Sequence, residues 1–100
     1  MSNKTLSTRQ GAQVDIVSRI RPMREAEGMS RDEFARETGL KFQSVTNYEL
    51  GRNKSIGSEQ LEKITNHPRF QKYALWLVTG NTAPEAGQIS PEIEVARDTG

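Results

Sequence analysis

The sequence contains no cysteine, which excludes disulfide bonds and cysteine-based metal sites within the chain. It contains a single histidine, His67, so neither a zinc site nor a histidine-based nucleophile arrangement has enough members. No glycine-rich phosphate loop occurs, and acidic pairs such as Glu25 and Glu27 or Glu92 and Glu94 come with no sign of a pocket. We therefore predict no metal, no cofactor and no enzymatic activity.

Long apolar runs are missing as well. No segment approaches the roughly 20 apolar residues that a membrane span requires, and the polar start of the chain lacks the apolar region of a signal peptide. A chain of 100 residues with 33% apolar and 27% charged residues is typical of one globular domain with a modest core. These features predict a cytoplasmic protein that does not bind membranes.

The net charge of +1 hides an uneven distribution along the chain. Residues 1–80 contain 13 lysine and arginine residues against 9 acidic ones, a net charge of +4, whereas residues 81–100 contain Arg97 against 4 acidic residues, a net charge of −3. Residues 1–12 show no apolar period. We predict a flexible N-terminal arm (1–12), a mildly basic domain (13–80) and an acidic C-terminal tail (81–100) that contacts a second copy or a partner.

Apolar spacing predicts an all-α fold of five short helices. The first covers residues 14–27, in which Pro22 is expected to kink or break the helix near Arg21, because an interior proline removes a backbone hydrogen bond at a cost of about 3 kcal/mol. The apolar residues that define this helix are Ile16, Val17, Ile20, Met23 and Ala26.

The next two helices have clear local boundaries. Ser30 can cap a helix over residues 31–38, and Glu33 stands at the third helical position to complete a capping box. Gly39 suits the left-handed C-terminal cap of that helix. A third helix follows after a very short connection, over residues 41–50.

Two further helices complete the predicted fold. Ser58 can cap the fourth, and Pro68 suits the first turn of a fifth helix that Gly80 closes. His67 precedes or caps that fifth helix. In the tail, prolines and glycines interrupt any period, so no helix is predicted there.

Residues 30–51 match the spacing of a helix-turn-helix unit, in which two short helices are joined by a turn with glycine and the second projects into the DNA major groove. Capped helices that stop at glycine also occur in ordinary helical bundles. The spacing alone therefore leaves DNA binding open.

The residues themselves add a resemblance. Residues 14–80, and above all 21–40 together with Tyr48-Glu49-Leu50-Gly51, resemble the lambda-repressor-like helix-turn-helix domain of the phage-repressor and Cro type. The match rests on four features of that family, which are a small inward residue, a turn glycine, an apolar residue in the recognition helix and a closing Glu-x-Gly. They fall on Ala35, Gly39, Val45, and Glu49 with Gly51. Residues 73–80 resemble the fifth helix of the family. Two positions depart from it, because Lys41 stands where Ser or Thr commonly caps the recognition helix and Pro22 interrupts the first helix.

The resemblance implies a regulator that binds duplex DNA. It implies base contacts by three residues, which are Phe42, Gln43 and Asn47, and a phosphate contact by Arg31. It also pairs Glu49 with Arg24, which would join the first helix to the third and hold Arg24 for a phosphate. The alternative for Glu49 is an exposed carboxylate without a fixed partner.

Physical reasoning supports these roles. If Val45 and Tyr48 point inward, the outer face of the third helix carries the candidate base-reading residues Phe42, Gln43, Thr46 and Asn47. The amide of Gln43 or Asn47 can bond the N7 and N6 groups of adenine, which is worth about 1–3 kcal/mol of discrimination. Phe42 can contact a thymine methyl group. The alternatives are a solvated polar face and a partly buried Phe42.

Phosphate contacts require donors around the reading helix, and helix N-termini supply backbone amides. Lys41 lies within reach of a phosphate or a guanine. The candidate phosphate-binding residues are Ser30, Arg31, Lys41, Arg52, Asn53, Lys54 and Arg24. The alternative for the basic loop at 52–54 is solvation.

These observations predict a transcriptional repressor that occludes a pseudo-palindromic operator as a homodimer, since one short reading helix covers too few base pairs for specificity. The candidate dimer residues are Tyr73, Trp76, Val78, Ile89, Ile93 and Val95, with core packing as their alternative. A second possible function is an antitoxin or antirepressor-binding module of the same fold, in which the acidic tail folds onto a regulatory protein partner.

Overall fold

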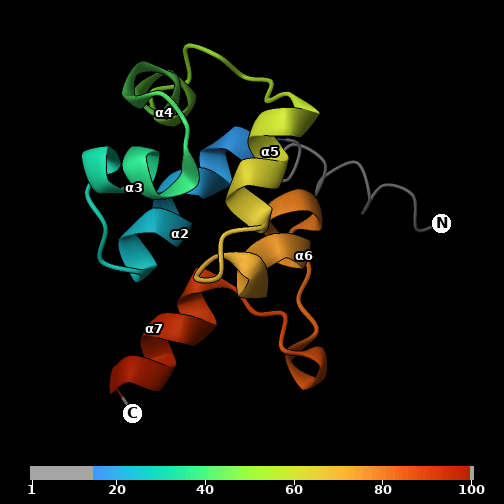
Figure 1. Cartoon of the computed structure of the whole chain (residues 1–100). Helices are drawn as coiled ribbons and strands as arrows, with labels where there is room; N and C mark the ends of the chain where they lie inside the picture. The colour runs from blue at the N-terminus through green and yellow to red at the C-terminus, as the bar shows by residue number, and fades with distance from the viewer. Residues whose placement is uncertain (1–14, 100) are drawn as a thin grey trace, which may run out of the picture.

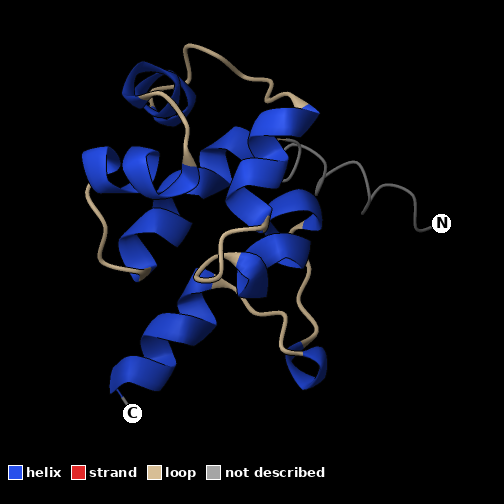
Figure 2. Ribbon diagram, viewed as in Figure 1, coloured by secondary structure: helices blue, strands red, loops and turns tan. Residues whose placement is uncertain are grey.

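Residues 15–99 are described by a computed structural model, and the predicted arm at 1–12 lies outside them. The described residues form six α-helices and three 3-10 helices and contain no strand (Figure 2). The all-α fold is therefore confirmed, with one α-helix more than expected. In the described part of the chain, no helix combines the length and the apolar character that crossing a membrane requires.

The first predicted helix is two elements. The 3-10 helix η1 (Ile16–Arg19) changes into the α-helix α2 (Ile20–Ala26) two residues before the expected break. Pro22 is the third residue of α2, within the first turn. Backbone N–H groups of a first turn have no partner within an α-helix, so proline is tolerated there.

The helix α3 (Arg31–Thr38) begins and ends at the predicted residues. The hydroxyl of Ser30 accepts a hydrogen bond from the backbone N–H of Glu33 at 3.1 Å, which caps the first turn. Gly39 closes the helix with φ of 82°, a left-handed conformation that glycine adopts without strain.

The helix α4 (Phe42–Glu49) follows after the short turn. Lys41 is its N-cap and makes no capping side-chain bond. At the other end, Gly51 has a φ of 76° and the backbone N–H of Arg52 donates to the carbonyl oxygen of Asn47 at 2.9 Å. This closure fixes the last turn of α4 and the direction in which the basic loop leaves it.

The helix α5 (Ser58–Thr65) starts one residue earlier than a Ser58 cap would require, because Gly57 is the N-cap. The predicted single fifth helix is wrong. Turns after Pro68 lead into the 3-10 helix η2 (Gln71–Tyr73) and then α6 (Ala74–Thr79).

His67 explains that break. Its backbone carbonyl oxygen accepts hydrogen bonds from the N–H groups of Phe70 and Gln71 at 2.9 and 3.1 Å, and its ring Nδ1 accepts the N–H of Arg69 at 3.1 Å. These bonds form a tight turn in place of a regular α-helical start. Gly80, with φ of 82°, then closes α6 as expected.

The tail contains a helix that the sequence did not predict. After the 3-10 helix η3 (Pro84–Ala86), the helix α7 (Pro91–Thr99) runs to the end of the described residues. Pro91 is the first residue of α7, where its missing N–H costs nothing and its fixed φ favours helix. The spacing of apolar residues did not predict α7, because Pro91 was expected to interrupt a helix and instead begins one.

The core lies between these helices, with α2 packed against α4 at one end and against α7 at the other (Figure 1). Phe34 and Phe70 meet edge to face in it, with ring centroids 5.1 Å apart. The buried apolar side chains are Val17, Ile20, Met23, Met29, Phe34, Ala35, Leu40, Val45, Tyr48, Ile64, Phe70, Tyr73, Leu77 and Ile89. The site described below therefore sits at one end of a packed scaffold.

Candidate nucleic-acid interface

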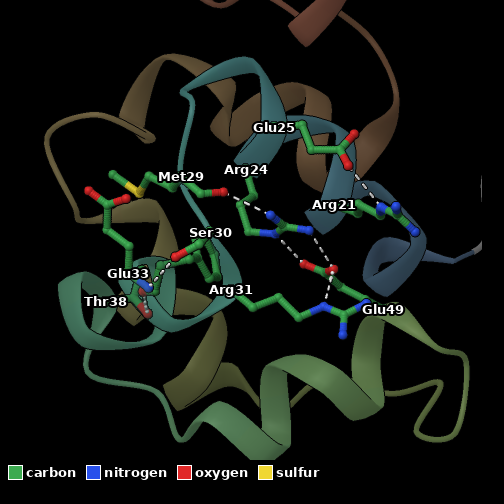
Figure 3. Close-up of polar contacts among 10 residues, drawn as sticks. Arg21, Arg24, Glu25, Met29, Ser30, Arg31, Glu33, Thr38 and Glu49 are labelled. Atoms are coloured by element: carbon green, nitrogen blue, oxygen red, sulfur yellow. Dashed lines mark hydrogen bonds and ion pairs between the residues drawn. The ribbon is translucent and has the colours of Figure 1, made fainter.

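The carboxylate of Glu49 is the centre of the helix-turn-helix unit. Arg24 donates to it twice, from Nε at 2.8 Å and from Nη2 at 2.9 Å, and Arg31 donates from Nε at 2.9 Å (Figure 3). The Glu49 side chain is 0% exposed. One residue near the end of α4 is thus bonded to both α2 and α3, which fixes the position of α4 against the scaffold.

Arg24 also joins the network to the turn after α2. Its Nη1 donates to the backbone carbonyl oxygen of Met29 at 2.8 Å, and the side chain is only 9% exposed. All three guanidinium nitrogens therefore bond protein groups. The expected pair with Glu49 is present. The three bonds use three of the five N–H groups of the guanidinium, so the predicted phosphate contact of Arg24 would rest on the remaining N–H groups of a side chain that is 9% exposed.

Arg31 is placed differently. It donates to Glu49 from Nε, and its side chain is 28% exposed. Its two terminal nitrogens therefore remain at the surface. Burial acts to raise the pKa of Glu49, but the hydrogen bonds from Arg24 and Arg31 outweigh it and hold that pKa below its usual range. The network therefore keeps Glu49 charged and Arg31 in a fixed orientation.

The outer face of α4 carries the predicted polar pair. Gln43 is exposed, and its Nε2 donates to Oδ1 of Asn47 at 3.1 Å. This bond leaves the amide oxygen of Gln43 and the amide nitrogen of Asn47 available, so the pair presents one acceptor and one donor together. Phe42, at the start of the helix, is 49% exposed.

Thr46 does not join this surface as expected. Its Oγ1 is buried and has no hydrogen-bond partner among residues 15–99, so the hydroxyl faces the protein and not a base edge. Leu50 is instead 49% exposed at the end of α4, and the sequence analysis missed it. The missed signal is its spacing, since residues seven apart share a helix face and Leu50 follows Gln43 by seven.

The candidate phosphate-binding residues surround α4. Arg52, Asn53 and Lys54 are exposed in the loop that follows it, and Lys41 is exposed at its start. Within the described residues, neither Arg52 nor Lys54 forms an ion pair with a carboxylate. Ser30 spends its hydroxyl oxygen on the cap of α3.

The candidate dimer residues fall into two groups. Tyr73 and Ile89 are 0% and 1% exposed in a single copy, so they belong to the core and their assignment to a dimer surface is corrected. Val78 and Val95 are 44% and 48% exposed, while Trp76 and Ile93 are partly buried. Side chains of α2 and α7 leave a groove of about 400 Å³ that includes Pro22, Ala26, Pro91 and Val95.

A second buried carboxylate belongs to Glu27, which the sequence analysis considered only as part of an acidic pair without a pocket. Its side chain is 7% exposed and accepts the hydroxyl of Tyr73 at 2.7 Å, Nε of Arg69 at 3.0 Å and Nζ of Lys72 at 2.9 Å. Lys72 also bonds Glu94 of α7 at 3.2 Å. No local signal identifies Glu27, because its partners lie more than forty residues away.

Residues 15–99 contain no group of three or more His, Asp or Glu side chains that could hold a metal ion. His67 is bonded instead to Glu37 on α3, at 2.8 Å.

Comparisons with known proteins point to the same unit. The family model described as Helix-turn-helix matches residues 20–68, which contain α2 to α5. Repressor protein C of Escherichia phage P2 is 37% identical over 78 residues, a segment that covers 78% of this chain and 78% of that protein. The match to the repressor covers the same share of both chains, and the family match includes both the Glu49 network and the outer face of α4.

Proposed function

Because the chain belongs to the phage-repressor and Cro type of helix-turn-helix proteins, we propose that it represses transcription by placing α4 in the major groove of a specific duplex operator. One observation carries the proposal. The Glu49 network fixes α4 against α2 and α3, while Gln43 and Asn47 face outward from the same helix. A rigid helix with a free polar face is what reading of base edges requires.

Gln43 and Asn47 read the bases as one unit. Their mutual hydrogen bond orients both amides, and the remaining acceptor and donor match the N6 amino group and N7 of adenine. Phe42 adds an apolar contact to a thymine methyl group at the start of the helix. Sequence preference therefore comes from residues 42–47 without the Thr46 hydroxyl.

Phosphate contacts position the helix in the groove. The surface nitrogens of Arg31 lie at the start of α3, and Arg52, Asn53 and Lys54 lie beyond the end of α4. Two clusters of donors flank the reading face and suit the two walls of the major groove. Lys41 adds a cation at the N-terminus of α4.

The repressor acts as a homodimer. A single α4 covers a few base pairs, and a two-fold axis doubles the sequence that is read. The groove between α2 and α7 supplies an exposed apolar surface around Val95, and a second hollow of about 310 Å³ shares Pro22 and Pro91 with it and is also lined by Trp76. These residues form the proposed interface between copies.

Selection of bound duplexes from a random pool tests the function. We expect enrichment of two inverted half-sites whose centres lie about 34–36 Å apart or a multiple of that. Sedimentation should show a dimer that Val95→Glu converts to a monomer, while Ala86→Glu, an exposed change in η3 outside the groove and the hollow, leaves it dimeric. Absence of any enriched sequence contradicts specific binding, and a monomer on an unrepeated site contradicts the dimer.

A further inference from the structure

We propose that Leu50 reads the 5-methyl group of a thymine in the major groove and is a specificity-determining residue that the polar face of α4 does not account for. The inference rests on the proposed function. Leu50 is 49% exposed, and few large hydrophobic side chains in the described part of this chain are similarly exposed. The four examples are Phe42, Leu50, Val78 and Val95. Two of these four belong to α4 or its cap.

A single exposed apolar residue needs no explanation by itself. Leu50 differs from an ordinary surface leucine in its position on α4. Leu50 follows Asn47 by three residues and Gln43 by seven, and its φ and ψ of −89° and 2° continue the helical turn. Residues at these intervals lie on one face of a helix. Leu50 thus extends the surface that carries the polar pair.

The backbone holds Leu50 in place. Its N–H donates to the carbonyl oxygen of Thr46 at 2.9 Å, and the next two N–H groups, of Gly51 and Arg52, bond Tyr48 and Asn47. Glu49, its neighbour in sequence, is locked by two arginines. The side chain is therefore presented by a rigid cap and not by a mobile loop, which suits a contact that discriminates between bases.

Charge around Leu50 favours DNA over an apolar protein surface. Arg52 and Lys54 follow it directly in the exposed loop, without carboxylate partners among residues 15–99. An apolar side chain between an amide pair and cations matches the major groove, whose wall is anionic and whose floor offers one apolar group, the thymine methyl. The occupant is thus duplex DNA with a thymine opposite Leu50.

Phe42 and Leu50 then bracket the reading face. They are eight positions apart, which corresponds to about 12 Å of helix rise. At about 3.4 Å per base pair, that distance spans up to three or four base pairs. The half-site should therefore contain two methyl-bearing positions with the amide-read bases between them.

Replacement of single thymines by deoxyuridine tests the proposal, because it removes one methyl group and keeps every hydrogen-bonding group of the base. Each thymine of the selected duplex is replaced in turn, and the dissociation constant is measured for the wild type and Leu50→Ala. Burial of one methyl group is worth about a fourfold change in affinity. We expect the wild type to lose about that factor at two positions, and Leu50→Ala to become insensitive at one of them.

Leu50→Met is the matched control, since it keeps an apolar side chain of similar length and should keep the sensitivity at that position. Thermal unfolding of each variant separates a folding defect from a lost contact. The inference is overturned if Leu50→Ala keeps the full uridine pattern of the wild type, or if it weakens binding to all sequences equally. A wild type that binds the selected duplex but responds to no uridine overturns it while leaving the proposed function intact, whereas failure to bind any duplex overturns both.

Discussion

Glu49 and Glu27 are both buried carboxylates bonded to cations, yet they hold together opposite ends of the molecule. Glu49 joins α2, α3 and α4 at the proposed DNA-binding end, whereas Glu27 joins the end of α2 to η2 and, through Lys72, to α7. The most buried cation of each network differs in exposure. The Arg24 side chain is 9% exposed, but Arg69 and Lys72 are 49% and 32% exposed.

Because of this difference, the two networks should respond differently to the loss of their carboxylate. Removal of Glu49 leaves a buried guanidinium with no counter-charge, whereas removal of Glu27 leaves cations that can turn into water. Only the first network contains α4, the proposed reading helix. The two sites should therefore differ in the free energy of unfolding that they contribute and, more sharply, in their effect on DNA binding.

The largest effect is expected for Glu49→Ala. Loss of one partner of a buried ion pair costs about 3–5 kcal/mol of unfolding free energy, and α4 also loses its bond to two neighbouring helices, so DNA affinity should fall with stability. Denaturant unfolding and DNA titration on the same samples measure both. Glu49→Gln, which keeps an acceptor for Arg24, should retain part of each. Unchanged stability would show that the pair contributes nothing in solution.

Glu27→Ala should cost less, about 2–3 kcal/mol, because Tyr73 keeps a buried hydroxyl without its acceptor while Arg69 and Lys72 regain water. In contrast to Glu49→Ala, the folded variant should bind the selected duplex with wild-type affinity. The measurement is a DNA titration well below the unfolding midpoint. A loss of affinity comparable to that of Glu49→Ala would remove the distinction between the two ends.

Within the DNA-binding end, base-reading and phosphate-binding residues should respond differently. Asn47→Ala should cost about 1–3 kcal/mol on the selected duplex, relax the preference at one or two positions and leave non-specific binding nearly unchanged. Because Gln43 and Asn47 share a hydrogen bond, the double variant Gln43→Ala/Asn47→Ala should lose less than the sum of the single losses.

The phosphate class is tested by Lys54→Ala and Arg52→Ala. Each should weaken binding to all sequences alike and reduce the slope of log affinity against log salt concentration by about one. Binding isotherms on matched and mismatched duplexes across salt concentrations give both quantities. If Asn47→Ala behaves like Lys54→Ala, the assignment of α4 to the major groove is wrong.

The smallest effect concerns pH. For both Glu27 and Glu49, burial acts to raise the pKa, but hydrogen bonds outweigh it and lower the pKa below that of the unfolded chain. Their stabilisation is therefore complete above the unfolded value of about 4.3 and is lost as pH falls through the lower folded values. Unfolding free energy should decline below about pH 5, and this decline should be shallower in Glu27→Gln and Glu49→Gln. Equal pH profiles would contradict this linkage.

Local patterns predicted most of the helix boundaries at the proposed DNA-binding end. The caps at Ser30 and Gly39 are short-range features, and α3 begins and ends where they predict. The pair between Arg24 and Glu49 came from resemblance, whereas its burial and its third member, Arg31, required the packed structure. Spacing placed Thr46 on the outer face, but packing against its neighbours buries its hydroxyl.

The sequence by itself determined the all-α fold, the helix-turn-helix unit and the outward polar face of α4, because caps, turns and helical periodicity depend on residues a few positions apart. Only the tertiary structure decided the rest. It placed Glu27 against Tyr73, moved Tyr73 and Ile89 from surface to core, and formed α7 against α2. These features depend on contacts between residues that are distant in the sequence, and no local sequence pattern predicts such contacts.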